Sequence, residues 1–444
     1  MDNPIPVAHC RSLVRLFAAL ALVPLLTLGC QSGTDGGSED VAFPDSTTHY
    51  QVDAQIRPAS GQFDVTVDMR FIPRAPTDTL RFLLHDAFEL EALASSAVDG
   101  YATSPWRLGG EDTLHTKVVT VPLARTATPD DPVAMEWMYA GRLQNEQIPG
   151  IGGAVVTPHW TELPIEAMWV PVHASLGTRF TFDATLDLPE GHEVVSPGVI
   201  QETADGWRVQ SPVPGPDVPL VISNQMQTRE RTDGLVPVTV YHGGAPDSVT
   251  SFVAERAGQV LDRYAQRFQG GSETDALRIT VAPVERATES SYARTGFIAL
   301  NHGAKPDPGL FGLIAHEAAH LWWTDAVNPM SRHNFLNESF AEYESWLALR
   351  AEYDDVFQDR LETARKRAQK APSFSEWTPR TDGLLSYNKG PVLLHQLHQR
   401  IGDADFQSFV AALQRDDVGT LGGMIATLET VTSAETAQWF ENKL

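Results

Sequence analysis

Cysteine is nearly absent from this chain of 444 residues. The two cysteines, Cys10 and Cys30, both lie in an N-terminal segment that has the composition of an export signal. The rest of the chain therefore has no thiol chemistry, and it needs no redox control in an oxidising compartment.

Positive charge is also scarce. Lys and Arg together number 33 against 57 Asp and Glu, which gives a formal net charge of −24 at pH 7. Nucleic acid is not an expected partner, because its phosphates need a basic surface. The acidic excess fits a salt-adapted protein or a very soluble exported one, and composition does not separate these two.

The N-terminal apolar run is short. It extends over Leu16–Leu28, follows Arg11 and Arg15, and is shorter than the roughly 20 residues that a membrane-spanning helix requires. A basic start followed by a short apolar run is typical of a secretory signal. We therefore expect residues 1–30 to be a signal peptide.

The end of this segment, LTLGC, resembles a bacterial lipobox, in which cleavage after Gly29 leaves Cys30 lipidated. Thr27 stands where leucine is usual, so the alternative is an ordinary signal peptide that is cut nearby. Gln31 in place of aspartate resembles the signal for outer-membrane sorting. The expected location is the bacterial cell envelope, with a membrane anchor through the lipid on Cys30 and the protein facing the periplasm or the outside.

Residues 31–43 are rich in Gly, Ser and Asp, as in a flexible tether. After them, apolar and polar residues alternate in runs separated by Pro and Gly clusters, which predicts strands. Two such runs around the turn PASG predict a hairpin, whose apolar faces are Tyr50, Val52, Ala54 and Ile56 on one strand and Phe63, Val65, Val67, Met69 and Phe71 on the other. Similar runs at Leu80–Leu84 and Phe180–Leu188 extend the pattern. Residues 44–232 are expected to be an all-β domain, and they lack a Gly-rich phosphate loop, a G-x-S-x-G elbow and an internal repeat.

From residue 233 the apolar period is that of helices. The pattern predicts a helix over 248–269, a buried strand over 277–284, a possible edge strand over Gly296–Leu300, and helices over 308–325, 337–352, 355–371, 387–401, 404–414 and 433–443. Asp307 before Pro308 predicts an N-cap, and Thr432 with Glu435 resembles a capping box. Residues 233–444 are expected to be an α+β, mostly helical domain.

The stretch LIAHEAAHLWWTDAV holds the residues with the strongest chemical signal. His316 and His320 are four apart, so on a helix both imidazoles point to one side and can reach one ion. Glu317 lies beside them, and H-E-x-x-H on a helix is the pattern of a zinc site with a glutamate base. The alternative is a packed helix that carries two surface histidines.

Two imidazoles do not complete such a site, because catalytic zinc usually takes three protein ligands and leaves one position for water. Glu338 in FLNESFAEY is the best third ligand, since it begins the next predicted helix. Glu342 lies one turn further on and is expected to hydrogen-bond a ligand histidine, which fixes the ring orientation. For both glutamates the alternative is a solvated carboxylate near a helix start, where the helix dipole favours negative charge.

Three blocks in this order, HEAAHLWWTDAV, LNESFAEY and YNKG at 387–390, resemble the alanyl aminopeptidase family of gluzincin metallopeptidases, which also contains leukotriene hydrolase. The strands HYQVDAQIRP and ATLDLPEGHEVVSPG resemble the family's N-terminal domain more loosely. The resemblance implies a two-domain fold, in which an N-terminal all-β saddle-like sandwich precedes an α+β thermolysin-like zinc-peptidase domain. It implies one Zn²⁺ per chain on His316, His320 and Glu338, with Glu317 as the general base and Tyr387 as the group that supports the oxyanion.

The chain departs from the family pattern in two places. One residue fewer separates His320 from Glu338, which a deletion in the intervening loop explains. The segment SSYARTGF at 290–297 falls on the family's G-x-M-E-N block, whose glutamate holds the free α-amine of a peptide, and Ala293 occupies that glutamate's position. Glu289 or Glu162 could replace it, although both have the pattern of ordinary surface residues. The exopeptidase mode is therefore in doubt, while the hydrolytic centre is complete.

The expected function is that of an exported zinc metallopeptidase acting on peptides. Gly296–Leu300 could bind a substrate backbone as an added strand, with Arg294, Gly296 and Phe297 as substrate-contacting candidates. For Tyr387 the alternative is an aromatic residue that packs at a helix start. Two other functions stay open, a cell-surface peptide-binding or scaffold protein without turnover and a zinc hydrolase of a non-peptide substrate.

Overall fold

We describe the protein from a computed structural model, which describes residues 43–106, 115–146, 153–268, 274–283, 291–300, 305–323, 332–378 and 380–444. The expected signal peptide, the lipidated Cys30 and the start of the tether lie outside these residues, as does Glu289. Within the described ranges, every helix is too short or too polar to cross a bilayer.

The first half of the described chain consists of strands. One sheet has the order β13-β14-β11-β1-β2-β7-β4. Its strands are β1 (Thr48–Arg57), β2 (Gln62–Phe71), β4 (Phe88–Ala94), β7 (Val133–Arg142), β11 (Phe180–Asp187), β13 (Val199–Thr203) and β14 (Gly206–Gly215). The hairpin predicted from the sequence is confirmed, because β1 and β2 pair antiparallel from His49↔Arg70 to Arg57↔Gln62. The apolar positions predicted for both strands are buried.

Two smaller sheets complete this domain, with the orders β10-β3-β6-β5 and β12-β15-β9-β8. Their strands are β3 (Thr77–His85), β5 (Ala102–Trp106), β6 (Thr116–Ala127), β8 (Val155–Val156), β9 (Thr161–Leu163), β10 (Val172–His173), β12 (Glu193–Val195) and β15 (Leu220–Ser223). Alternate residues of β1, β2, β3, β7 and β11 share one apolar core that also includes Trp169. Sheets that face one another across such a core form a sandwich, so the predicted N-terminal β fold is confirmed.

The second half begins with a mixed sheet of order β16-β17-β18-β20-β19. Its strands are β16 (Gln227–Arg231), β17 (Val238–His242), β18 (Leu277–Val281), β19 (Tyr292–Arg294) and β20 (Phe297–Leu300). The prediction of an edge strand over Gly296–Leu300 is wrong, because β20 pairs with β18 on one side and with β19 on the other. The edge is β19, which was not predicted because three residues are too few to show a period.

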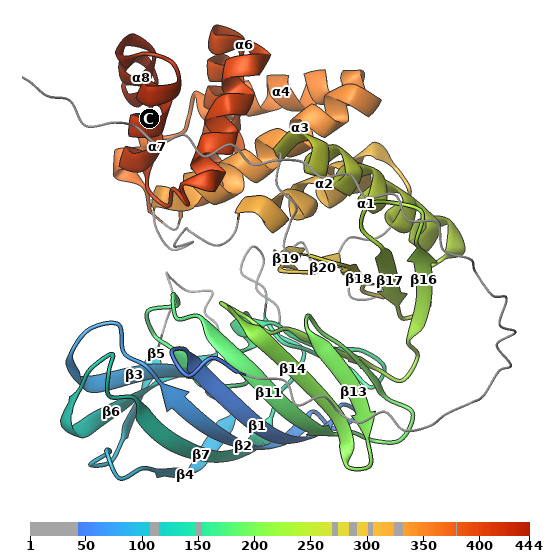
Figure 1. The fold of residues 1–444 in the computed structure, drawn as a ribbon. Helices are drawn as coiled ribbons and strands as arrows, with labels where there is room; N and C mark the ends of the chain where they lie inside the picture. Colours follow the sequence, from blue (N-terminus) through green and yellow to red (C-terminus); the bar gives the residue numbers. More distant parts are fainter. Residues whose placement is uncertain are drawn as a thin grey trace, which may run out of the picture. The chain divides into compact units, whose positions relative to one another are not determined.

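Helices make up the remainder (Figure 1). They are α1 (Asp247–Phe268), α2 (Pro308–Trp323), α3 (Phe340–Glu352), α4 (Asp354–Ala368), α5 (Asp382–Leu384), α6 (Gly390–Arg415), α7 (Leu421–Val431) and α8 (Ala434–Glu441), with π-helical turns η4 (Phe335–Ser339) and η6 (Leu385–Lys389) before α3 and α6. The predicted mostly helical second domain is confirmed. The position of the boundary at residue 232 stays a prediction, since residues 41–444 form one compact unit.

Of the two helix starts predicted from capping residues, one is confirmed and the other is shifted by one residue. Asp307 Oδ1 accepts from the Leu310 backbone N–H at 2.9 Å, as predicted for the start of α2. The capping box predicted at Thr432 is wrong, because Ser433 caps α8 and accepts from Thr436 N. The break predicted between residues 401 and 404 is a kink at Gly402, whose φ of 80° suits glycine. Helix α7 was missed because Gly422 and Gly423 hide its first turn.

Contacts between the β domain and the mixed sheet hold the sheet in place. Val155, Trp160, Val195 and Val221 of the β domain form one apolar cluster with Ala282, Phe297 and Ala299 of the sheet. The Arg278 guanidinium donates to the carbonyls of Ser196 and Gly198 at 2.8 and 2.7 Å. The sheet that runs beside helix α2 is therefore fixed to the sandwich.

The two π-helical turns, η4 and η6, pack against each other. Ser339 Oγ donates to the backbone carbonyl of Ser386 at 2.8 Å, and both residues are fully buried. Gly390 begins α6 at this contact, where an added Cβ would lie 2.0 Å from Ser339 Oγ and 2.6 Å from Ser339 Cβ. The close approach of the turns therefore requires glycine at this position.

We expect Gly390→Ala to lower the free energy of unfolding by about 1–3 kcal/mol, because overpacking forces the two turns apart. The control is Gly422→Ala in α7, where an added Cβ meets nothing within 4 Å and alanine is favoured over glycine by up to about 1 kcal/mol. Urea denaturation of both variants measures the difference. Equal stability of Gly390→Ala and the wild type would contradict the close packing.

Candidate active site

Helix α2 carries three functional side chains on one buried segment. His316, Glu317 and His320 have exposed fractions of 7%, 4% and 6%. Their helix packs against α1 and α3 (Figure 1), and the alanines at 315, 318 and 319 are fully buried in the core beside them. Small residues on that face let the neighbouring helices come close, so the imidazoles point into the interior rather than into solvent.

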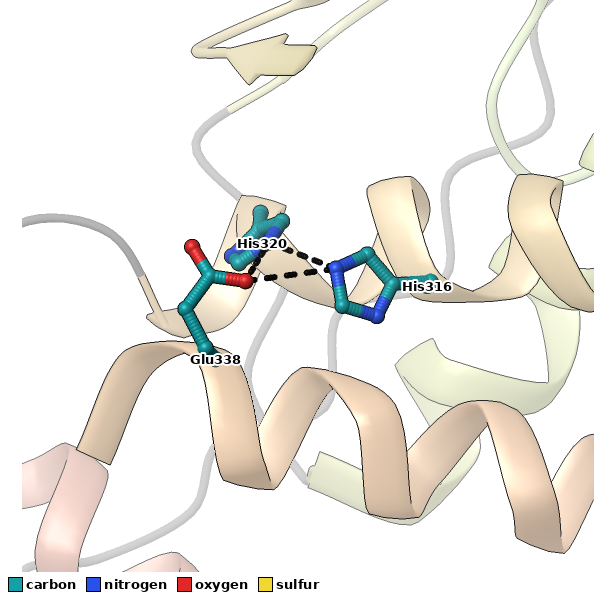
Figure 2. Close-up of side chains that lie close together, drawn as sticks. All are labelled: His316, His320 and Glu338. Carbon is teal, nitrogen blue, oxygen red and sulfur yellow. Dashed lines mark hydrogen bonds and ion pairs between the residues drawn. The ribbon is translucent and has the colours of Figure 1, made fainter. Parts of the chain in front are cut away.

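Glu338 reaches the histidines from the η4 turn. Its Oε2 lies 3.4 Å from His316 Nε2 and 3.5 Å from His320 Nε2, and the two Nε2 atoms are 3.2 Å apart. Figure 2 shows the three side chains converging from the two helical segments. The predicted trio is thus brought together as a group able to hold a metal ion, and within the described ranges no other such group of His, Cys, Asp and Glu occurs.

The three distances fit a zinc ion. Zinc binds imidazole nitrogen and carboxylate oxygen at about 2.0–2.2 Å in tetrahedral geometry, which places ligand atoms about 3.3–3.5 Å from each other. The observed separations of 3.2 to 3.5 Å match the edges of such a tetrahedron. Three ligands leave the fourth vertex for a water molecule or a substrate atom.

Hydrogen bonds orient both imidazole rings. His316 Nδ1 donates to Glu342 Oε2 at 3.1 Å, the contact expected from the sequence, and Glu342 also accepts from Trp346 Nε1 at 2.8 Å. His320 Nδ1 donates to Asn337 Oδ1 at 2.8 Å. A proton on Nδ1 leaves the Nε2 lone pair of each ring free for a metal. Asn337 was missed from the sequence, although it stands next to Glu338 in the L-N-E block.

Glu317 lies beside the cluster and is not part of it. Its Oε2 is buried without a hydrogen-bond partner among the described residues. Burial raises the pKa of this carboxyl group, whereas the charges of His316 and His320 lower it. A carboxylate with a free oxygen and a raised pKa, next to a metal cluster, is suited to accept and return a proton.

Tyr387 lies in the η6 turn, next to His316. Its ring stacks on the His316 ring, with centroids 5.8 Å apart and planes at 25°. Burial of the hydroxyl and the charge of Glu338 raise the pKa of Tyr387 well above its usual value. The hydroxyl therefore keeps its proton and can donate it in a hydrogen bond, while 40% of the residue's surface stays exposed.

The pKa values of the ligands show that the cluster favours positive charge. Burial alone would lower the pKa of His316, but hydrogen bonds to Glu338 and Glu342 raise it well above its usual value. Burial would raise the pKa of Glu338, but His320 and His316 hold it well below the usual range. The carboxylate is therefore ionised and available to a cation.

The substrate-contact candidates lie on β19 and β20. Phe297 is fully buried in the cluster with Trp160, so its side chain packs against the β domain and does not line a surface. Gly296 forms the turn between the strands with a φ of 71°. Because both edges of β20 are paired, an added substrate strand would have to pair with β19 instead.

Arg294 joins β19 to acidic side chains of the β domain. Its Nε donates to Asp217 Oδ2 at 2.8 Å, and its Nη2 lies 3.5 Å from Glu166 Oε1. Glu162 belongs to the same group, since its charge acts on Glu166. The expectation that Glu162 is a surface residue is wrong, because it is fully buried in β9. Ala293, between Tyr292 and Arg294, is buried in the core.

Comparison with known proteins agrees with this geometry. Residues 305–417 match the family model described as "Peptidase family M1 domain", a segment that includes the metal cluster, Glu317 and Tyr387. Human endoplasmic reticulum aminopeptidase 2 is 25% identical over 199 residues, which are 40% of this chain and 21% of that protein, so the matched region spans about a fifth of the relative's length.

Solved structures give the same fold. The M1 zinc metallopeptidase from Deinococcus radiodurans superposes with a TM-score of 0.70 at 18% identity, over 89% of this chain and 93% of that one. A mutant of the Deinococcus protein bound to a Tyr-Ser-Ala substrate has a TM-score of 0.69 at 17% identity over the same shares. The two-domain fold expected from the sequence resemblance is confirmed.

Replacing Glu342 tests the orientation of His316. In Glu342→Gln, an amide NH₂ replaces one oxygen and cannot accept from His316 Nδ1, so we expect the affinity for zinc to fall about 10–100-fold. The control is Glu362→Gln, an exposed residue of α4 that pairs with Lys366. Competition with a chromophoric chelator measures both affinities, and unchanged binding by Glu342→Gln would show that the bond does not orient the ring.

Proposed function

We propose that this protein is an exported, zinc-dependent metallopeptidase that hydrolyses peptide bonds, since residues 305–417 match the family model described as "Peptidase family M1 domain". The observation that carries the proposal is the match between the ligand-atom separations of His316, His320 and Glu338 and the edges of a zinc tetrahedron. Glu317 and Tyr387 lie beside this cluster, which supports their proposed roles as base and hydrogen-bond donor.

One Zn²⁺ per chain would be held by His316 Nε2, His320 Nε2 and Glu338 Oε2. A zinc ion in such a site supplies Lewis acidity toward a carbonyl group and a water molecule. The protein supplies the orientation, since Glu342 and Asn337 fix the two rings before any ion arrives.

Glu317 is proposed as the general base. Its free Oε2 takes a proton from the attacking water, and its raised pKa lets it hold that proton until the departing amine needs it. The carbonyl oxygen gains negative charge in the tetrahedral state. The Tyr387 hydroxyl donates a hydrogen bond to that oxygen, an effect of about 3–4 kcal/mol for one donor in comparable sites.

Peptides are proposed as the substrates. The Deinococcus neighbour was solved with a Tyr-Ser-Ala substrate, and the human relative carries the name of an aminopeptidase. Position 293 is alanine, so it has no carboxylate that could bind the free amine of such a peptide. We propose that the acidic group of Glu162, Glu166 and Asp217 replaces it, because Asp217 and Glu166 contact Arg294 of β19, the strand that also carries position 293, and the charge of Glu162 acts on Glu166.

Arg294 links this acidic group to the cluster. Its charge lowers the pKa of Glu317, which places the guanidinium within electrostatic reach of the base. This electrostatic reach supports the proposal that an amine held by Asp217 or Glu166 lies near the proposed base.

The buried Ala293 favours a second candidate function, a cell-surface peptide-binding or scaffold protein without turnover. A zinc hydrolase of a non-peptide substrate is the third candidate.

For location, we propose the bacterial cell envelope with a lipid on Cys30, supported by LTLGC and the apolar run before it. Metabolic labelling with a radioactive fatty acid tests this, because Cys30→Ala should then carry no label.

Glu317→Gln tests the assigned base. The amide cannot accept a proton, so we expect kcat on peptides to fall by at least about 10²-fold, while zinc content stays near that of the wild type because Glu317 is not a ligand. Zinc is measured by elemental analysis and hydrolysis by mass spectrometry of a peptide library. The control is Glu362→Gln, and retained hydrolysis by Glu317→Gln would refute the role.

Mapping the products from the same peptide library tests whether the protein acts as an aminopeptidase or an endopeptidase. We expect single-residue cuts from free N-termini, and N-terminal acetylation should slow them at least about tenfold, because a hydrogen-bonded charge contributes about 1.5–3 kcal/mol. Internal cuts that acetylation does not affect would show that the acidic group does not bind the amine. If the library stays uncut but lipids or epoxides are hydrolysed in a chelator-sensitive way, the result would favour a zinc hydrolase of a non-peptide substrate. If nothing is hydrolysed, the result would favour a peptide-binding or scaffold protein.

A further inference from the structure

Asp382 stands between the two turns that carry Glu338 and Tyr387, and neither the sequence nor the proposed mechanism gives it a role. It begins the short helix α5, directly before the η6 turn. Its carboxylate accepts three hydrogen bonds: Oδ1 from Trp377 Nε1 at 2.7 Å and from Ser386 Oγ at 2.9 Å, and Oδ2 from Asn334 Nδ2 at 3.2 Å. A half-buried carboxylate with three donors is held in one orientation.

The donors belong to the elements that position the site. Asn334 is the residue before η4, the turn that carries Glu338. Ser386 immediately precedes Tyr387 and is fully buried. Asp382 therefore ties the start of one π-helical turn to the interior of the other, four residues before Glu338 and one residue before Tyr387.

The link through Asp382 adds to a second hydrogen bond at Ser386. The Ser386 carbonyl accepts from Ser339 Oγ, so Ser386 is held through its backbone by the Glu338 turn and through its side chain by Asp382. The two bonds fix η6 against η4 from two directions. They hold the turn that carries Tyr387 against the turn that carries Glu338.

We propose that Asp382 is a positioning residue of the metal site: by linking Asn334 to Ser386, it places Glu338 against the two imidazoles and Tyr387 where it meets the substrate oxygen. Its effect on turnover rests on the proposed peptidase function, whereas its effect on the geometry of the metal ligands does not. Displacements of about 1 Å in such groups can cost about 10²-fold in rate, so a carboxylate that touches no ligand can still control kcat.

The test exchanges the two partners of one hydrogen bond. In Asp382→Asn, the side-chain oxygen can still accept from Trp377 and Ser386, but an NH₂ group then faces the NH₂ group of Asn334. The double variant Asn334→Asp with Asp382→Asn restores the bond with donor and acceptor reversed. The control is Asp403→Asn, whose carboxylate accepts from His398 Nε2 at 2.7 Å in the kinked part of α6.

Two readouts are compared across these variants. For Asp382→Asn we expect kcat to fall about 10–100-fold, with KM changed less than about threefold. In the double variant, kcat should recover at least about half of this loss on a logarithmic scale. Asp403→Asn should have the kcat of the wild type. In the Co²⁺-substituted proteins, the visible absorption spectrum should change in Asp382→Asn and return toward the wild type in the double variant. This spectrum reports ligand geometry without turnover.

Each outcome decides one question. An inactive wild type whose Co²⁺ spectrum follows the expected pattern refutes the proposed function and supports the positioning role. An active wild type whose kcat and Co²⁺ spectrum are unchanged in Asp382→Asn refutes the positioning role. A loss that the exchange does not recover, or that Asp403→Asn shares, assigns Asp382 to general stability and equally overturns the proposal.

Discussion

The site depends on the packing of helix α2 against the η4 turn, since that contact alone brings Glu338 to the imidazoles. Ala315, Ala318 and Ala319 of α2 are fully buried in the core of the helical domain, which also includes Phe335 and Leu336 of η4. A metal site tolerates errors of only about 0.2 Å in its ligand distances. Close-packed interiors deform little, so the core supplies the precision that three separate side chains could not maintain.

Both turns that bear functional groups depart from α-helical geometry. Glu338 lies in η4 and Tyr387 in η6, and both turns are π-helical. Such turns are rare and occur often at functional sites. Here, the Ser339–Ser386 hydrogen bond and the absent side chain at Gly390 hold the two turns together. Tertiary packing therefore offsets the cost of a local conformation that each segment alone would not prefer.

The sequence predicts what depends on local pattern. Alternation located the buried faces of β1 and β2, because successive strand side chains point to opposite faces. The four-residue spacing placed His316 and His320, with Glu317 between them, on one helix, because helical residues four apart point to the same side. The start of the next predicted helix indicated Glu338, and the resemblance to a known family added Tyr387. The approach of both residues to the histidines depends on how the two π-helical turns pack in the fold.

Features that depend on tertiary contact were missed or wrong. The burial of Glu162 follows from the pairing of β9 with β15, and the two-sided pairing of β20 follows from the return of β19. Asn337 and Asp382 are ordinary polar residues in the sequence, and only the fold shows that their partners are His320 and Ser386. Short or irregular elements carry too few residues for a period to identify them.

The electrostatics of the centre link its chemistry to its stability. Glu317, Glu338, Glu342 and Asp382 lie within electrostatic reach of the cluster or of one another, while the two imidazoles are neutral when they bind a metal. Arg360, 3.5 Å from Glu342, and the more distant Arg294 offset part of this charge. Buried carboxylates in excess lower stability or take up protons.

A divalent cation among the ligands offsets two of these negative charges where they are densest. When no ion is bound, hydrogen bonds to Glu338 and Glu342 raise the pKa of His316. A proton and a metal ion therefore compete for the same nitrogen, and metal binding becomes weaker as the pH falls. The acidic side chains that we propose to serve hydrolysis are thus also the ones whose charge a bound cation would offset.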